Sequence, residues 1–234
     1  MELLYEGKSK RMFEIEDPFV LKVEYKDEVT TADGRKRGEA PGKGRLSNII
    51  TSEMFDRLEK MGIPSHFIER TGDTTQLVRK VEIIPLEVVV RNLAAGNITK
   101  RLGFKKGREF APPLLEIYLK DDELGDPLIN RAHAIQMDIA TDKEISELKK
   151  RAHQLNVALI GIMEEMGLQL IDFKVEFGRD TRGNILLADE ISPDTCRIWD
   201  PKTGENFDKD VFREGTGSVV DTYKKFYEKM EAVK

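Results

Sequence analysis

The sequence contains few of the residues that mark several common classes of protein. Its 234 residues include a single cysteine, Cys196, so no intrachain disulfide can form, and this scarcity is typical of a reducing compartment. The three histidines, His66, His133 and His153, are scattered and show no Cys/His spacing that would bind zinc. Lysine and arginine number 38 against 43 aspartates and glutamates, so the formal net charge is -5 and the basic excess of a nucleic-acid-binding protein is missing. We therefore expect neither a zinc site nor a nucleic-acid partner.

Long apolar runs and the best-known nucleotide motifs are missing as well. The densest apolar stretch, residues 88–90, is far shorter than the roughly 20 residues that span a bilayer, and MELLYEGKSKR at the start has no signal-peptide core. Neither the Walker A spacing nor G-x-G-x-x-G occurs. Hydrophobic residues make up 39% of the chain and charged residues 35%. This balance predicts a folded, water-soluble, cytoplasmic protein with a highly charged surface and no membrane partner.

The mixture of strand-like and helix-like segments predicts an α+β fold, with a strand-rich N-terminal lobe at residues 1–85 and a larger lobe at residues 86–234. Short β-rich segments bounded by turn residues predict strands at residues 10–15, 19–25, 66–70, 75–81, 86–91, 115–120, 168–178 and 184–189. Apolar residues at helical spacing predict helices at residues 46–61, 142–166 and 218–233. Thr141 and Glu144 form a capping-box pattern at the start of the second helix.

Two segments interrupt these patterns. Residues 26–44 are polar, contain four glycines and have no apolar period, so we expect a long loop that is functional or disordered. Pro112 and Pro113 predict a break in the chain before the strand at residues 115–120.

The most informative segment is IDFKVEFG, residues 171–178, in which apolar and charged residues alternate strictly. Asp172, Lys174 and Glu176 therefore share one face of a strand. The next strand, NILLADE, ends at Asp189, and a hairpin centred near residues 182–183 would place Glu176 opposite Asp189. Cross-strand partners have Cβ atoms about 4.5–5.5 Å apart, close enough for two carboxylates to share Mg²⁺. Taken alone such a strand is more typical of a solvated face, but the polar, turn-rich loop that follows Glu190 favours a site.

Two further segments have weaker signals. In LYEGKSKRMF, residues 4–13, a glycine precedes Lys8 and Lys10 and could fold over phosphates, although alone this is more typical of an ordinary basic turn. In VVVRNLAAGNITKRLG, residues 88–103, a strand leads Arg91 into a turn of small residues, and Asn97 can cap the following helix. An arginine beside a helix N-terminus suits phosphate, and simple strand-to-helix packing is the alternative.

Together these segments resemble the family of phosphoribosylaminoimidazole-succinocarboxamide synthases (SAICAR synthetases). The resemblance covers nearly the whole chain and rests on LYEGKSK, TTADGRKRG, VVVRNLAAG, PPLLEIYLKDDELGDP, IDFKVEFG and DEISPDTCRIWD in this order. It implies an ATP-grasp-like fold related to the kinase catalytic core, and a homodimer. It also implies ATP, Mg²⁺, a carboxyaminoimidazole ribotide (CAIR) and L-aspartate as reactants, with SAICAR, ADP and phosphate as products in purine biosynthesis.

The resemblance also implies roles for individual residues. Nucleotide and metal contacts would come from Lys8, Lys10, Met12, Leu21, Glu82 and Ile83, with Glu176 and Asp189 as the metal carboxylates. Catalytic and ribotide contacts would come from Asp172, Lys174, Lys120, Asp126, Arg91, Arg197, Arg213 and Asp33, with the loop at residues 33–43 closing over the site. Asn97 stands where some relatives carry serine, and its amide can still donate to a phosphate.

The chemistry expected from this resemblance is activation of the ribotide carboxylate by ATP, which forms an acyl phosphate. The amine of aspartate then displaces phosphate and forms the amide. Two other functions are compatible with a nucleotide site of this kind. A kinase-like phosphotransferase would stop after phosphoryl transfer, and a nucleotide sensor would bind ATP without turnover.

Overall fold

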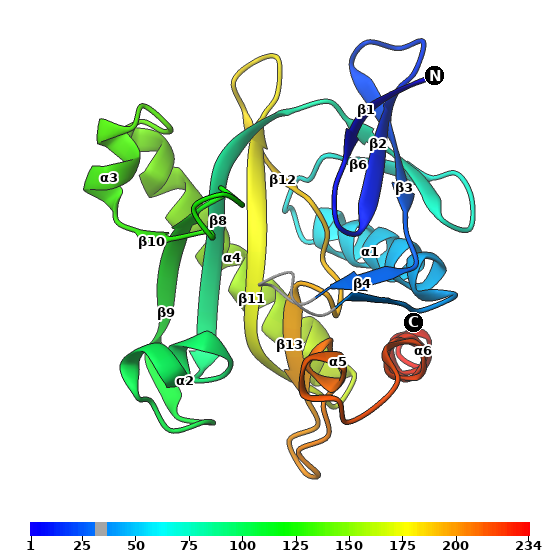
Figure 1. Cartoon of the computed structure of the whole chain (residues 1–234), viewed down its shortest axis with the longest axis vertical. Helices are drawn as coiled ribbons and strands as arrows, with labels where there is room; N and C mark the ends of the chain where they lie inside the picture. Colours follow the sequence, from blue (N-terminus) through cyan, green and yellow to red (C-terminus); the bar gives the residue numbers. More distant parts are fainter. Residues whose placement is uncertain (31–36) are drawn as a thin grey trace.

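Antiparallel pairing organises the chain into two main sheets, shown in Figure 1. The structure is a computed structural model that describes residues 1–30 and 37–234. The first sheet has the order β1-β2-β3-β7-β6, from the strands β1 Glu2–Glu6, β2 Lys10–Glu14, β3 Val20–Tyr25, β7 Thr75–Arg79 and β6 Phe67–Arg70. The second has the order β10-β9-β8-β11-β12, from the strands β10 Leu128–Ile129, β9 Glu109–Leu119, β8 Glu82–Leu93, β11 Gln169–Arg179 and β12 Ile185–Ala188. A last strand, β13 Cys196–Trp199, also pairs with β11.

Helices cover these sheets and join them through one core. Helix α4 Asp142–Glu165 packs on β8 and β11, and its capping box is formed as the sequence predicts. Helix α1 Lys43–Lys60 contacts the first sheet and also α6 Val219–Glu231, so its side chains belong to the same hydrophobic cluster as those of α4. The shorter helices are α2 Asn97–Leu102, α3 Arg131–Gln136 and α5 Asp210–Glu214. Each large apolar side chain buried in this cluster contributes about 1.5–3 kcal/mol to the stability of the fold.

The central strand β11 separates the apolar core from a charged surface. Phe173, Val175 and Phe177 are buried in the cluster with α4. The intervening Asp172, Lys174 and Glu176 lie on the other face, because successive side chains of a strand point to opposite faces. The predicted alternation is therefore confirmed.

The predicted loop at residues 26–44 is only partly correct. Its described ends contain β4 Glu28–Thr30 and β5 Arg37–Glu39, which pair with each other, and α1 begins at Lys43. Three-residue strands are too short to show a period in sequence, and in β4 only the adjacent Val29 and Thr30 are buried. Residues 31–36, which include Asp33, lie outside the described residues.

The break predicted at Pro112 and Pro113 was wrong, since both lie inside β9. The ladder between β8 and β9 is irregular there, passing from Arg91↔Leu114 to Leu93↔Glu109. The neighbouring strand β10 pairs with β9 only at Ile117 and Tyr118. Prolines are tolerated in a sheet where a bulge or an open edge needs no N–H donor, and both conditions hold at this end of β9.

The division of the chain near residue 85 stays a prediction, although β8, the first strand of the second sheet in chain order, starts at Glu82. None of the helices in the described ranges combines the length and apolarity that a bilayer crossing requires.

Candidate active site

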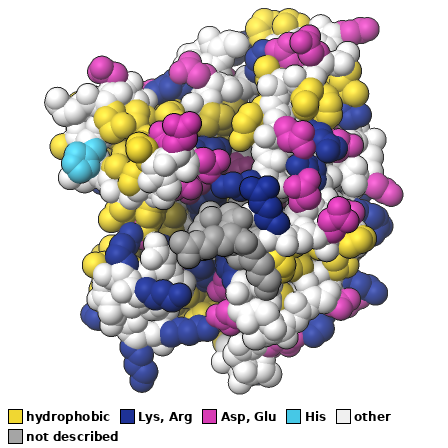
Figure 2. Space-filling model, viewed as in Figure 1, with side chains coloured by type: hydrophobic (Ala, Val, Ile, Leu, Met, Phe, Trp, Pro, Cys, Tyr) yellow, Lys and Arg dark blue, Asp and Glu magenta, His cyan; other side chains and the backbone are white. Residues whose placement is uncertain are grey.

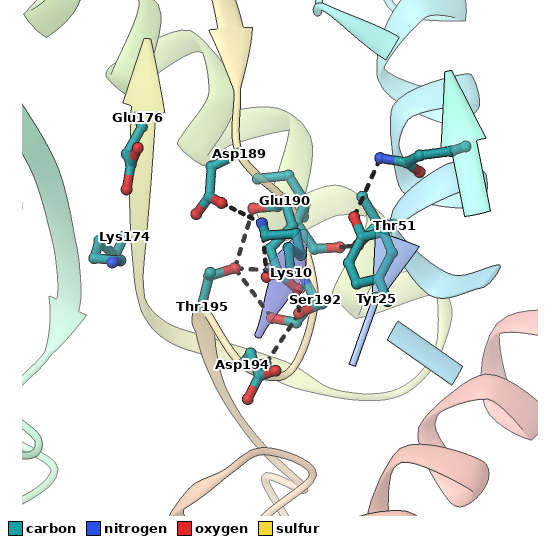
Figure 3. Close-up of polar contacts among 12 residues, drawn as sticks. Lys10, Tyr25, Thr51, Lys174, Glu176, Asp189, Glu190, Ser192, Asp194 and Thr195 are labelled. Atoms are coloured by element: carbon teal, nitrogen blue, oxygen red, sulfur yellow. Dashed lines mark hydrogen bonds and ion pairs between the residues drawn. The ribbon is translucent and has the colours of Figure 1, made fainter. Parts of the chain in front are cut away.

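Charged side chains of both signs gather near the middle of the face drawn in Figure 2. A network of ion pairs joins side chains of β11, of the start of β2 and of the segment that follows β12. Figure 3 shows Lys10, Lys174, Glu176 and Asp189 from these three elements around one space.

The two predicted metal carboxylates meet, but not by the predicted register. Glu176 pairs with Ala188, one residue before Asp189. A one-residue shift would normally turn Asp189 to the opposite face of the sheet. Asp189 instead adopts a left-handed backbone with φ 62°, which ends the strand and redirects its side chain. Its charge consequently acts on Glu176: burial and the nearby Asp189 together raise the pKa of Glu176.

Three lysines balance this pair of carboxylates. Lys10 forms ion pairs with Asp189 and, at 3.0 Å, with Glu190, while Lys120 Nζ lies 2.6 Å from Glu176 Oε2. Burial acts to raise the pKa of Asp189, but Lys10, Lys174 and Lys120 outweigh it and hold that pKa at about 2. Asp189 is therefore ionised, with three cations nearby.

The donor set fits Mg²⁺ better than a softer metal. Among the described residues no group of three or more His, Cys, Asp and Glu could hold a metal ion, and the pair Glu176 and Asp189 offers two carboxylates. Mg²⁺ commonly uses one or two carboxylates, with water and substrate phosphates completing its shell. The repulsion that raises the pKa of Glu176 is also the interaction that a bound cation would relieve.

A second charged cluster lies at the other end of the same face of β11. Asp172 accepts hydrogen bonds from Arg91 Nη1 at 2.6 Å and from Arg197 Nη1 at 2.9 Å. Arg91 Nε donates to Glu116 at 2.7 Å, and Asp210 joins Arg197, at 2.8 Å, to Arg213, at 2.5 Å. The structure therefore brings together the three arginines for which the resemblance implies ribotide contacts. Arg91 is 4% exposed, so these pairs fix its orientation as well as its charge.

The turn after β8 supports this arginine cluster, although Asn97 is not the helix cap. Gly96, with φ 61°, caps α2, and no cap hydrogen bond comes from a side chain. A Cβ at Gly96 would lie 2.5 Å from Cζ of Arg197. Only glycine therefore lets the guanidinium pack against this turn.

The remaining predicted residues lie around the two clusters. Lys8 forms an exposed 2.7 Å ion pair with Asp122, which links the turn after β1 to the loop at residues 120–127. Asp126, with φ 49°, accepts a hydrogen bond from the backbone N–H of Asp121 at 3.0 Å, so it shapes that loop. Met12 and Leu21 pack in the small cluster of the first sheet, whereas Glu82 and Ile83 are exposed at the start of β8. Their contacts with adenine stay predictions.

Sequence reasoning missed two glutamates. Glu190 is 2% exposed and holds Lys10 together with Asp189. Glu87 lies 2.5 Å from Lys174. The sequence did contain a pattern that could have identified Glu87. Glu87, Val89 and Arg91 are two residues apart along a strand, so Glu87 lies on the same face as Arg91.

A buried histidine beside these carboxylates predicts acid sensitivity of the free protein. Burial, aided by the charge of Lys10, lowers the pKa of His66 to about 4, against about 6.5 in an unfolded chain. The unfolded chain therefore binds this proton first, and the free energy of unfolding falls as pH drops from about 6.5 towards 4. Between pH 7 and pH 5 we expect His66 to account for a loss of about 2 kcal/mol.

Urea unfolding of the wild type and His66→Phe at these two pH values tests this expectation. Phenylalanine keeps the edge-on contact with the Phe55 ring, whose centroid lies 5.7 Å away, and removes the titration. His153 is exposed on α4, so His153→Gln serves as the control and should retain the wild-type pH dependence. Equal losses in the wild type and His66→Phe would contradict the prediction.

Comparison with known proteins decides the family. Residues 3–230 match the family described as SAICAR synthetase. The chain belongs to the SAICAR synthetase family. A phosphoribosylaminoimidazole-succinocarboxamide synthase from Staphylococcus carnosus is 59% identical, with 100% of both chains covered. A crystal structure of the corresponding synthase from Ehrlichia chaffeensis is 39% identical, with a TM-score of 0.96 and 100% of both chains covered. A SAICAR synthetase in complex with ADP is 46% identical, with a TM-score of 0.93 over 97% of this chain and 96% of that one.

The membership confirms the resemblance seen in the sequence and the α+β, SAICAR-synthase-like fold. It also confirms the expectation of a nucleotide-dependent ligase of purine biosynthesis.

Proposed function

We propose that this SAICAR synthetase family member joins L-aspartate to the carboxylate of CAIR at the expense of ATP, through an acyl phosphate. The observation that carries the proposal is the arrangement along one face of β11. A carboxylate pair surrounded by Lys10, Lys120 and Lys174 lies at one end, and the arginine cluster lies at the other. The relative bound to ADP supports a nucleotide at such a site.

The lysines and arginines suit two anionic reactants. Lys10, Lys120 and Lys174 would neutralise the ATP phosphates and the charge that develops during phosphoryl transfer. Mg²⁺ held by Glu176 and Asp189 would supply further positive charge to these phosphates. Arg91 and Arg197, oriented by Asp172, would hold the ribotide, since a guanidinium binds phosphate or carboxylate with two parallel hydrogen bonds.

The chemical order follows from the poor reactivity of a carboxylate. The CAIR carboxylate would attack the γ-phosphorus and ADP would leave, which converts the carboxylate into an acyl phosphate. The amine of aspartate would then attack the carbonyl carbon and phosphate would leave. Exclusion of water from the site would protect the acyl phosphate from hydrolysis.

Product analysis with labelled substrate tests this proposal. Purified protein is incubated with Mg-ATP and CAIR that carries ¹⁸O in its carboxylate, with and without L-aspartate. We expect aspartate-dependent ADP release, SAICAR in the mass spectrum, and one ¹⁸O atom in the released phosphate. Unlabelled phosphate would overturn the acyl phosphate. A phosphorylated product without any aspartate requirement would instead identify a phosphotransferase, and ATP binding without turnover would identify a sensor.

We also infer that the chain acts as a cytoplasmic homodimer with a lobe boundary near residue 85. The scarcity of cysteine supports the compartment, and the family resemblance supports the dimer. Sedimentation at micromolar concentration tests the assembly, and a monomer mass would overturn it.

A further inference from the structure

We propose that Glu87 accepts the proton that the aspartate nitrogen must lose when the amide forms. The inference rests on the proposed acyl phosphate and adds a catalytic residue to it. Glu87 lies on β8 directly across from Glu176. Opposite residues of an antiparallel pair point to the same face, so Glu87 faces the same space as Lys174 and Glu176.

One carboxylate oxygen of Glu87 is available to accept a proton. Its Oε1 lies 2.5 Å from Lys174 Nζ, and its Oε2 accepts no hydrogen bond from any residue in the described ranges. Its side chain is 14% exposed, so it is largely sheltered from bulk water.

The other carboxylates near Glu87 in the described chain already have partners or a proposed metal role. Glu176 and Asp189 are the metal pair, and Glu190 is held by Lys10 and by the Ser192 hydroxyl. Asp172 is held by Arg91 and Arg197, and Glu116 by Arg91, Arg101 and Tyr118. Glu87 is therefore the carboxylate with remaining hydrogen-bonding capacity beside the reacting groups.

The proton must leave as the C–N bond forms. Aspartate reacts as its free amine, whose lone pair bonds to the carbonyl carbon while the C=O π electrons move to oxygen. The nitrogen becomes positively charged and strongly acidic, and Glu87 Oε2 takes its proton. The C=O bond then re-forms, and phosphate leaves with the electron pair of its C–O bond. Lys174, which Glu87 holds, would stabilise the transient oxyanion.

The variant Glu87→Gln separates acceptance of the proton from the contact with Lys174. The amide keeps an oxygen for Lys174 Nζ but cannot accept the proton. We expect the rate of SAICAR formation to fall by about 10²–10⁴-fold, the usual range for loss of a general base. Hydroxylamine can replace aspartate as the nucleophile, and it is uncharged and weakly basic at neutral pH. The nitrogen of its adduct is more acidic than that of the aspartate adduct, so water can take the proton without Glu87. Hydroxamate formation from CAIR and Mg-ATP therefore reports acyl phosphate formation and should stay within about threefold of wild type.

The controls make each outcome decisive. Glu147→Gln removes a half-buried glutamate whose 2.7 Å ion pair with Arg151 lies on α4, and it should behave as wild type in both assays. Normal SAICAR formation by folded Glu87→Gln would overturn the role. Equal losses of SAICAR and hydroxamate would overturn it too, by showing that Glu87 acts before the acyl phosphate. A wild-type chain that makes neither product would instead refute the proposed function itself.

Discussion

Asp189→Asn is expected to lower turnover by about 10³-fold or more while the protein remains folded. The substitution removes one of the two negative charges available to Mg²⁺ and a partner of Lys10. Loss of several kcal/mol of charge stabilisation at a transferring phosphoryl group corresponds to this factor, since each 1.36 kcal/mol is about tenfold in rate. Asparagine tolerates the left-handed φ of 62° at this position, and Glu190 still pairs with Lys10.

Steady-state turnover and thermal unfolding of Asp189→Asn, measured together, check this result. Asp138→Asn is the matched control, because Asp138 also has a left-handed φ, 54°, and is exposed beyond α3. We expect this control to retain wild-type turnover. Near-normal activity of a cooperatively folded Asp189→Asn variant would show that Asp189 does not bind the metal. Calorimetric titration of Mg²⁺ into the nucleotide-bound protein gives an independent reading, and the variant should bind the ion more weakly.

Arg91→Ala is expected to weaken ribotide binding by about 100-fold and also to destabilise the protein. The first effect follows from loss of a preoriented guanidinium, whose charge-assisted hydrogen bonds contribute about 1.5–3 kcal/mol each. The second follows because Glu116 and Asp172, 8% and 3% exposed, would lose a buried cation. Breaking such a buried pair typically costs about 3–5 kcal/mol.

Two measurements separate these effects: the apparent affinity for CAIR at saturating ATP, and urea unfolding without ligand. Arg131→Ala is the control, because Arg131 forms an exposed 2.5 Å contact with Asp142 and belongs to neither charged cluster. Exposed pairs contribute less than about 1 kcal/mol, so this variant should stay near wild type in both measurements. An unchanged CAIR affinity in Arg91→Ala would show that Arg91 only supports the fold.

The sequence alone was sufficient to predict the long helices, most of the longer strands and the charged face of β11. These features depend on short-range patterns: the alternation from residue 171 to residue 177, the capping box at Thr141 and Glu144, and the glycine at residue 62 that ends α1. Strand and helix periods are local properties of the chain, so the alternation along β11 and the long helices were confirmed. The order of the motifs was also sufficient to identify the family.

How those faces meet depends on pairing between strands that are distant in the chain. Glu176 was predicted opposite Asp189, yet the ladder pairs it with Ala188, and a left-handed residue restores the approach of the two carboxylates. Lys174 and Glu87 are 87 residues apart in the chain and become neighbours because β8 lies beside β11. Register, bulges and ion-pair partners arise from pairing between distant strands, where a shift of one residue changes every facing side chain. Local patterns do not contain those pairings, so the contacts of Glu87 with Lys174 and of Glu190 with Lys10 emerged only from the folded chain.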